Sequence, residues 1–162
     1  MKRIVLKSLV ILSIITFSIS VNAQQKYKTA LGLRGGYPSG VTGKHFISNT
    51  NAIEGIVTFG GWGGFGVTGL YQIHNPIPDA PGFNWYYGGG AHIATAVADK
   101  ANPWSNSTGG KLFLGVDGIL GAEYVFEEAP ISLSLDVLPI LNIVEDIGVW
   151  FNAGFSIRYT FK

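Results

Sequence analysis

Apolar and polar residues alternate with a period of two along several stretches of this chain of 162 residues. In the segment 151–162 the apolar set is Phe151, Ala153, Phe155, Ile157, Tyr159 and Phe161, and the polar set is Asn152, Gly154, Ser156, Arg158, Thr160 and Lys162. The segments 111–126 and 131–137 alternate in the same way. Because successive side chains of a β-strand point to opposite faces, this period predicts strands with one apolar and one polar face.

Turn residues divide the chain into eight such segments. Strands are predicted at 28–37, 40–48, 51–60, 64–74, 84–97, 111–126, 130–141 and 148–161. Clusters of Gly, Pro, Ser and Asn near 37–40, 48–51 and 60–64 have the composition of hairpin turns, and two longer connections cover 75–84 and 99–110. The sequence therefore predicts an all-β fold: an antiparallel up-and-down transmembrane β-barrel of about eight strands.

The first 23 residues have the features of a cleaved signal peptide. Lys2, Arg3 and Lys7 form a basic start, an apolar run extends over 9–21, and small residues at 21–23 precede the expected cleavage before Gln24. The alternative is a transmembrane anchor, but the run is short for a hydrocarbon core of about 30 Å. We therefore assign 1–23 to the signal peptide and 24–162 to the barrel domain.

Charge and cysteine content exclude several classes of function. Loss of the three basic residues of the signal peptide changes the formal net charge from +1 to −2, and no Lys/Arg cluster remains, so nucleic acid is not an expected partner. The chain has no cysteine, which excludes a disulfide framework, a cysteine-based zinc site and a thiol nucleophile.

Alternation alone does not decide which face of the barrel points outward. A lipocalin-like secreted barrel hides its apolar face, whereas a membrane barrel exposes it to lipid. Charged residues make up 13% of the chain, which is too few for a water-facing surface. We therefore place the polar faces inside, and with them a network of charges in the interior: Arg34, Lys44, Glu54, Asp117, Glu123, Asp136 and Arg158.

Aromatic residues near the predicted strand ends support the membrane interpretation. Tyrosine and tryptophan rings are enriched at the two interfaces of a bilayer. The predicted interface aromatics are Tyr37, Trp62, Trp85, Tyr86, Tyr87 and Trp150. The soluble lipocalin-like barrel remains the alternative.

The end of the chain resembles the last strand of bacterial outer-membrane β-barrels. The segment 154–162 reads Gly-Phe-Ser-Ile-Arg-Tyr-Thr-Phe-Lys, with Tyr159 and Phe161 as its aromatics and one departure, in that Lys162 follows the last aromatic. The glycine-rich segment 85–90 is similar to small barrels of Bacteroidetes-type bacteria, and the architecture is similar to OmpX-like and OmpA-membrane-domain-like proteins.

The resemblance implies a location and a set of partners. The location would be the outer membrane of a Gram-negative cell, in contact with its lipid and lipopolysaccharide. Tyr159 and Phe161 would be read as an assembly signal by the barrel-assembly machinery, after periplasmic chaperones deliver the chain, and the folded protein would be a monomer.

No motif in the sequence predicts catalysis, a metal or a cofactor. Residues 61–66 match G-x-G-x-x-G, but a nucleotide site needs a helix after that motif, and a strand is predicted here. His45, His74 and His92 lack the spacing of metal ligands. Some outer-membrane barrels modify lipid A with a serine, a histidine and an acid. No persuasive set of this kind is visible, and such an enzyme remains an alternative.

A structural or interaction role through extracellular loops is therefore the function that the sequence favours. Opposite charges inside a narrow barrel should pair and close it, although a proton or ion path is the other use of such a set. With both termini periplasmic, the turns near 37–40, 60–64, 98–110 and 142–148 lie outside the cell. The turns near 48–51, 75–84 and 127–130 then lie inside.

Overall fold

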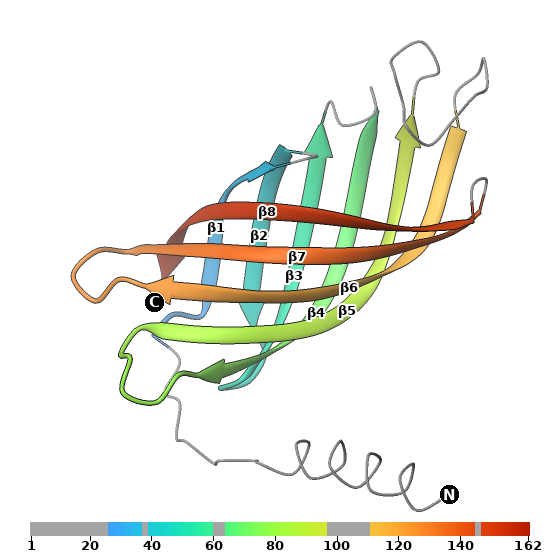
Figure 1. Ribbon diagram of the computed structural model, residues 1–162. Helices are drawn as coiled ribbons and strands as arrows, with labels where there is room; N and C mark the ends of the chain where they lie inside the picture. The colour runs from blue at the N-terminus through green and yellow to red at the C-terminus, as the bar shows by residue number, and fades with distance from the viewer. Residues whose placement is uncertain (1–25, 37–38, 60–63, 97–110, 145–146) are drawn as a thin grey trace, which may run out of the picture.

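The computed structural model describes residues 26–36, 39–59, 64–96, 111–144 and 147–162. Eight antiparallel strands form a closed barrel in which each strand pairs with the next and β8 pairs with β1 (Figure 1). This confirms the predicted fold class. The strands are β1 (Thr29–Gly36), β2 (Ser39–Phe46), β3 (Asn51–Phe59), β4 (Phe65–Pro76), β5 (Phe83–Ala96), β6 (Lys111–Val125), β7 (Ile131–Val144) and β8 (Gly148–Phe161).

The ends of the barrel differ in what they carry. The first and last described residues, Lys26 and Lys162, lie at the same end as the turns β2–β3, β4–β5 and β6–β7, and we call this the terminal end (Figure 1). At the opposite end, the loop end, the strands lead into 37–38, 60–63, 97–110 and 145–146. The predicted signal peptide falls outside the described residues.

Burial follows the alternation strand by strand. Along β8 the side chains of Ser156 and Arg158 are fully buried, whereas those of Phe155 and Ile157, which alternate with them, are exposed. In β7 the inward residues are first polar, from Ser132 to Asp136, and then apolar, at Leu138 and Ile140. The period of two in the sequence is therefore the inside–outside period of the wall.

A glycine on an inner face allows the wall to curve sharply. Gly90 of β5 pairs with Leu70 of β4, and a Cβ atom built on Gly90 would lie 1.8 Å from the carbonyl oxygen of Gly69. No other residue type fits there without displacing the backbone.

The wall has unequal height around the barrel. Strands β1, β2 and β3 have 8, 8 and 9 residues, whereas β5 to β8 have 14 or 15. The last residue of β1, Gly36, pairs with Gly154, so the first six residues of β8 extend beyond β1 toward the loop end.

Candidate functional site

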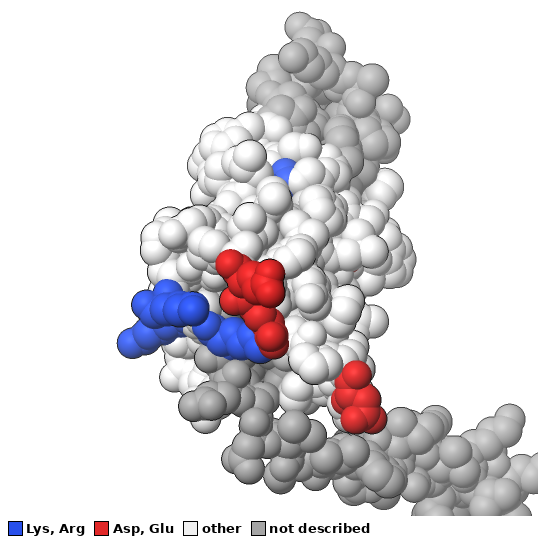
Figure 2. Space-filling view, turned by 90° about the vertical axis from the view of Figure 1, so that its left-hand side faces the viewer, with Lys and Arg blue, Asp and Glu red and all other residues white. Residues whose placement is uncertain are grey.

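The outer face of the barrel is a continuous apolar surface. Every strand contributes exposed apolar side chains, among them Leu33, Val41, Ile53, Val67, Ile93, Leu120, Leu135 and Phe151. The charged side chains that the structure describes as exposed all lie at the terminal end: Lys26, Lys28, Asp79, Glu127, Glu128 and Lys162. In Figure 2 this end carries neighbouring basic and acidic groups, while the wall above them is almost free of charge. We call this uncharged surface the apolar belt.

The interior contains apolar clusters and a polar layer, and the centre of the polar layer is the guanidinium of Arg158. Arg158 of β8 forms an ion pair with Glu54 of β3 through Nη2 and lies 3.7 Å from Glu123 Oε1 through Nη1. The same Nη1 donates a hydrogen bond of 2.7 Å to Ser134 Oγ. Arg158 is 0% exposed, so both of its acidic partners compensate a charge that is withdrawn from water.

The carboxylate of Glu54 has further partners on the neighbouring strands. Thr42 Oγ1 donates to Glu54 Oε1 over 2.5 Å, and Gln72 Nε2 donates to Glu54 Oε2. Glu123 on β6 accepts a hydrogen bond of 2.9 Å from Tyr27 OH. The two carboxylates are thus held by neutral donors as well as by cations.

Lys44 of β2 is the second cation of this layer. Its Nζ lies 3.6 Å from Glu123 Oε1 and 3.9 Å from Glu54 Oε2, and 4.4 Å from the centre of the Tyr86 ring. These separations exceed a direct hydrogen bond, and the ammonium group has no hydrogen-bond partner among the described atoms. Lys44 therefore balances charge in the layer rather than fixing its geometry.

A second ion pair joins β1 and β7, the two neighbours of β8, on the inner face of the barrel. Arg34 donates from Nη1 to Asp136 Oδ2 over 2.9 Å and from Nη2 to Asp136 Oδ1 over 2.5 Å. Tyr86 OH of β5 donates to Asp136 Oδ2 over 3.0 Å. Gly154 makes room for this pair, because a Cβ atom there would lie 2.1 Å from Arg34 Nη2.

A third polar group lies on β5, β6 and β7. His92 Nδ1 is 2.7 Å from Asp117 Oδ1, and His92 Nε2 is 3.0 Å from Asn142 Oδ1. This group resembles part of a catalytic set, but Asp117 and Asn142 occupy both ring nitrogens, and among the described residues neither nitrogen contacts a hydroxyl nucleophile. In the described part of the chain, no three His, Asp or Glu side chains are arranged to hold a metal ion.

The seven charges named from the sequence all have buried side chains on inner faces. Six of them lie in the two ion-pair groups around Arg158 and Arg34, and Asp117 lies apart with His92. Sequence reasoning missed Tyr27, Gln72 and His74. Alternation could have found Gln72 and His74, because they share the parity of the inward residue Leu70.

Two of the predicted interface aromatics are wrong. Tyr86 is 0% exposed and stacks on His74 in the interior, with ring centres 4.8 Å apart. Trp150 is half-buried and packs against the inner apolar clusters that contain Phe113 and Ile140. Both residues occupy the inward-facing set of alternate positions on their strands. Proximity to a strand end was therefore not sufficient to assign a ring to the bilayer interface.

The other aromatics are distributed between the outer surface and the undescribed segments. Trp85 and Tyr87 are exposed and stack with ring centres 5.4 Å apart. Tyr159 and Phe161 are also exposed, and their rings meet edge to face with ring centres 4.9 Å apart. Tyr37 and Trp62 lie outside the described residues.

Comparison with known proteins identifies the fold. No protein-family model and no curated protein matches the chain. No helix in the described segments has the length and apolar character needed to cross a membrane. A search of solved structures matches the N-terminal β-barrel domain of Pseudomonas aeruginosa OprF, with a TM-score of 0.68 and 14% identity, over 85% of this chain and 100% of that chain. The predicted likeness to small bacterial barrels is thus confirmed in the fold, and the chain is an eight-stranded closed antiparallel β-barrel of the kind found in that OprF domain.

Proposed function

We propose that the protein is an integral outer-membrane β-barrel with a structural or interaction role. The observation that carries the proposal is the apolar belt, since exposed apolar residues occur on all eight strands and every described exposed charge lies at the terminal end. Such a surface is costly in water and favourable in a bilayer, where the closed barrel satisfies the backbone hydrogen bonds of every strand.

We further propose that the interior is closed to solutes. Arg158 of β8 pairs with Glu54 of β3, and Arg34 of β1 pairs with Asp136 of β7 across the intervening strand β8, so these ion pairs join strands that are not neighbours inside the barrel. An eight-stranded barrel has an interior just wide enough for its own side chains. These ion pairs therefore stabilise the barrel and prevent open conduction.

The interaction role belongs to the loop end. Four connections leave the barrel there, and 97–110 is the longest of them. Outer-membrane barrels have short periplasmic turns and longer extracellular loops, so we place the loop end outside the cell and both termini in the periplasm. The longest turn at the terminal end has six residues and connects β4 with β5. Backbone hydrogen bonds hold it, such as the one that Phe83 N donates to Ala80 O over 3.0 Å.

The test combines membrane insertion and permeability. The purified protein, refolded into lipid vesicles, should migrate differently on SDS gels before and after boiling, and vesicles that contain it should remain impermeable to small sugars. Recovery from cells as a soluble periplasmic protein would refute the membrane assignment, and rapid sugar influx would refute the closed interior. A changed lipid A mass profile in cells that express the protein would instead identify a lipid-modifying enzyme.

A further inference from the structure

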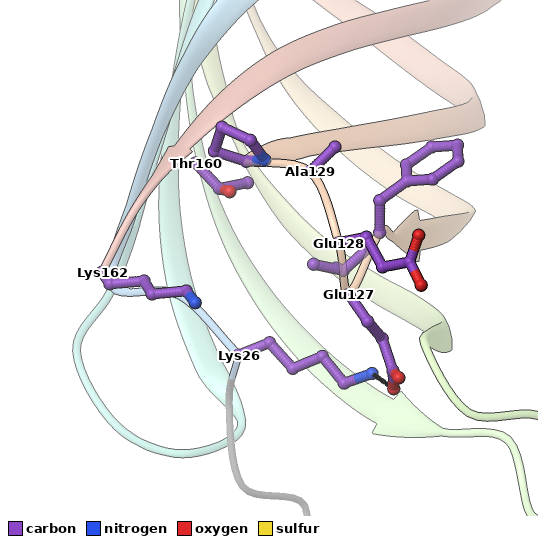
Figure 3. Close-up of a pocket in the computed structure, with 9 residues that line it drawn as sticks. Lys26, Glu127, Glu128, Ala129, Thr160 and Lys162 are labelled. Atoms are coloured by element: carbon purple, nitrogen blue, oxygen red, sulfur yellow. Dashed lines mark hydrogen bonds and ion pairs between the residues drawn. The ribbon is translucent and has the colours of Figure 1, made fainter.

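A pocket at the terminal end has both basic and acidic walls. It has a volume of about 340 Å³ and lies between the end of β8, the chain before β1 and the β6–β7 turn (Figure 3). Its polar lining consists of Lys26, Thr160 and Lys162 on one side and Glu127 and Glu128 on the other. The backbone on either side is tied together, because Thr160 N donates to Pro130 O over 2.9 Å.

The charges of the pocket are only partly satisfied within the protein. Lys26 Nζ lies 2.5 Å from Glu127 Oε1, and this hydrogen bond and the charge of Lys26 lower the pKa of Glu127, so its carboxyl stays ionised. The side chain of Glu127 remains 64% exposed. Lys162 and Glu128 are exposed, and neither has an ion-pair partner among the described residues. Counting only the described residues, the pocket thus presents an unpaired cation and an unpaired anion on opposite sides of an ion pair.

The position of the pocket fits the headgroup region of a bilayer. Phe126 lines the pocket and is 39% exposed, and Phe161, adjacent to Thr160 and Lys162, is 45% exposed. Both rings belong to the margin of the apolar belt, where aromatic side chains meet lipid headgroups. A lipid in this position would place its acyl chains on the belt and its headgroup against the pocket.

We propose that this pocket binds the headgroup of a phospholipid that carries both a phosphate and a primary amine. The proposal rests on the membrane location proposed above. The phosphate accepts hydrogen bonds from Lys162 and Lys26, and the ammonium group donates to Glu128 and Glu127. A trimethylated amine has no N–H to donate, and a purely anionic headgroup leaves the glutamates facing negative charge. The pocket therefore discriminates against both.

The experiment counts lipids that remain bound to the barrel. The protein is refolded into vesicles of phosphatidylethanolamine, phosphatidylcholine and phosphatidylglycerol in equal amounts, extracted in mild detergent and analysed by native mass spectrometry. We expect phosphatidylethanolamine to be enriched roughly twofold to fivefold over each of the others, the range for a few partly exposed charge pairs. Equal occupancy, or a preference for phosphatidylglycerol, would overturn the proposal.

Matched variants assign the effect to this pocket. Glu128→Gln should remove the preference for phosphatidylethanolamine over phosphatidylcholine, and Lys162→Gln should lower the retention of all three lipids. Lys28→Gln and Asp79→Asn remove a charge of the same sign at the same end without lining the pocket, so they should retain wild-type selectivity. Selectivity that survives Glu128→Gln, or is lost in the two controls, would refute the assignment.

Failure of this inference is distinguishable from failure of the proposed function. Every variant is first tested for insertion by its heat-dependent migration on SDS gels. Failure of the wild-type barrel to insert refutes the membrane location itself. A barrel that inserts and binds all lipids equally refutes only the headgroup site.

Discussion

Replacement of Arg158 by leucine removes the cation on which the central polar layer depends. In the wild type its guanidinium contacts Glu54 and Glu123 and donates to Ser134 Oγ, all at positions withdrawn from solvent. In Arg158→Leu, Lys44 is the only lysine or arginine among the described residues within 4 Å of the two buried carboxylates, 3.6 Å from Glu123 and 3.9 Å from Glu54, and the imidazole of His74 lies 3.7 Å from Glu123. We therefore expect the variant to fold less efficiently and to unfold more readily.

The magnitude follows from the loss of one partner of a buried ion pair, which costs about 3–5 kcal/mol. Glu54 keeps its hydrogen bonds from Thr42 and Gln72, so we expect a loss near the lower limit, about 3 kcal/mol. With a urea dependence of about 1–3 kcal/mol per molar, the midpoint should fall by at least about 1 M. The midpoint is measured by urea unfolding in detergent, monitored by tryptophan fluorescence and by gel migration.

Two further variants control the interpretation. Ser134→Ala removes one neutral acceptor of Arg158 and should cost only about 1 kcal/mol. The double variant Arg158→Leu/Glu54→Leu removes the carboxylate together with its cation and should be more stable than Arg158→Leu alone. A single variant as stable as the wild type would show that Arg158 is solvated and that the pairing described here is wrong.

Three other predictions concern packing, assembly and orientation. Gly154→Ala places a methyl group against Arg34 and should lower the free energy of unfolding by about 1–3 kcal/mol in the same assay. An unchanged free energy of unfolding would show that the guanidinium moves aside freely. Phe161→Ala should slow insertion in cells, measured by pulse-chase, more than refolding into vesicles; equal rates in cells would exclude it as an assembly signal. Cysteine at Ser107 should react with an impermeant thiol reagent on intact cells and cysteine at Asp79 should not, and the reverse pattern would invert the topology.

The sequence was sufficient to predict the barrel because its signal is local. Alternation within one strand defines its faces, and the bounds of seven strands agree with the structure within two residues. The exception is β7, which was expected to end at 141 and continues to Val144. The apolar run from Leu138 to Leu141 hides the alternation there, since its even positions point into an apolar part of the interior.

The partners inside the barrel could not be predicted in the same way. Arg158 and Glu54 are separated by 104 residues and lie on strands that are not neighbours, so their contact depends on the stagger and closure of all eight strands. Tyr86 illustrates the opposite case. Its parity with Gly88 and Gly90 already indicated an inward position, and the aromatic neighbours Trp85 and Tyr87 drew it into the wrong group.

The unequal strands also determine how the protein would sit in a bilayer. At about 3.3 Å per residue, β8 with its 14 residues spans roughly 46 Å along its length, and β1 with its 8 residues spans roughly 26 Å. Strands of a barrel tilt by about 35–45° from its axis, so along the axis β8 covers roughly 33–38 Å and β1 roughly 18–21 Å, against a hydrocarbon core of about 30 Å. The β5–β8 side of the barrel is then longer than the hydrocarbon core and the β1–β3 side is shorter. Such a mismatch is relieved by tilting of the barrel, or by thinning of the lipid beside the short strands. The barrel would therefore have a preferred direction of tilt, with the β5–β8 wall projecting farthest from the membrane.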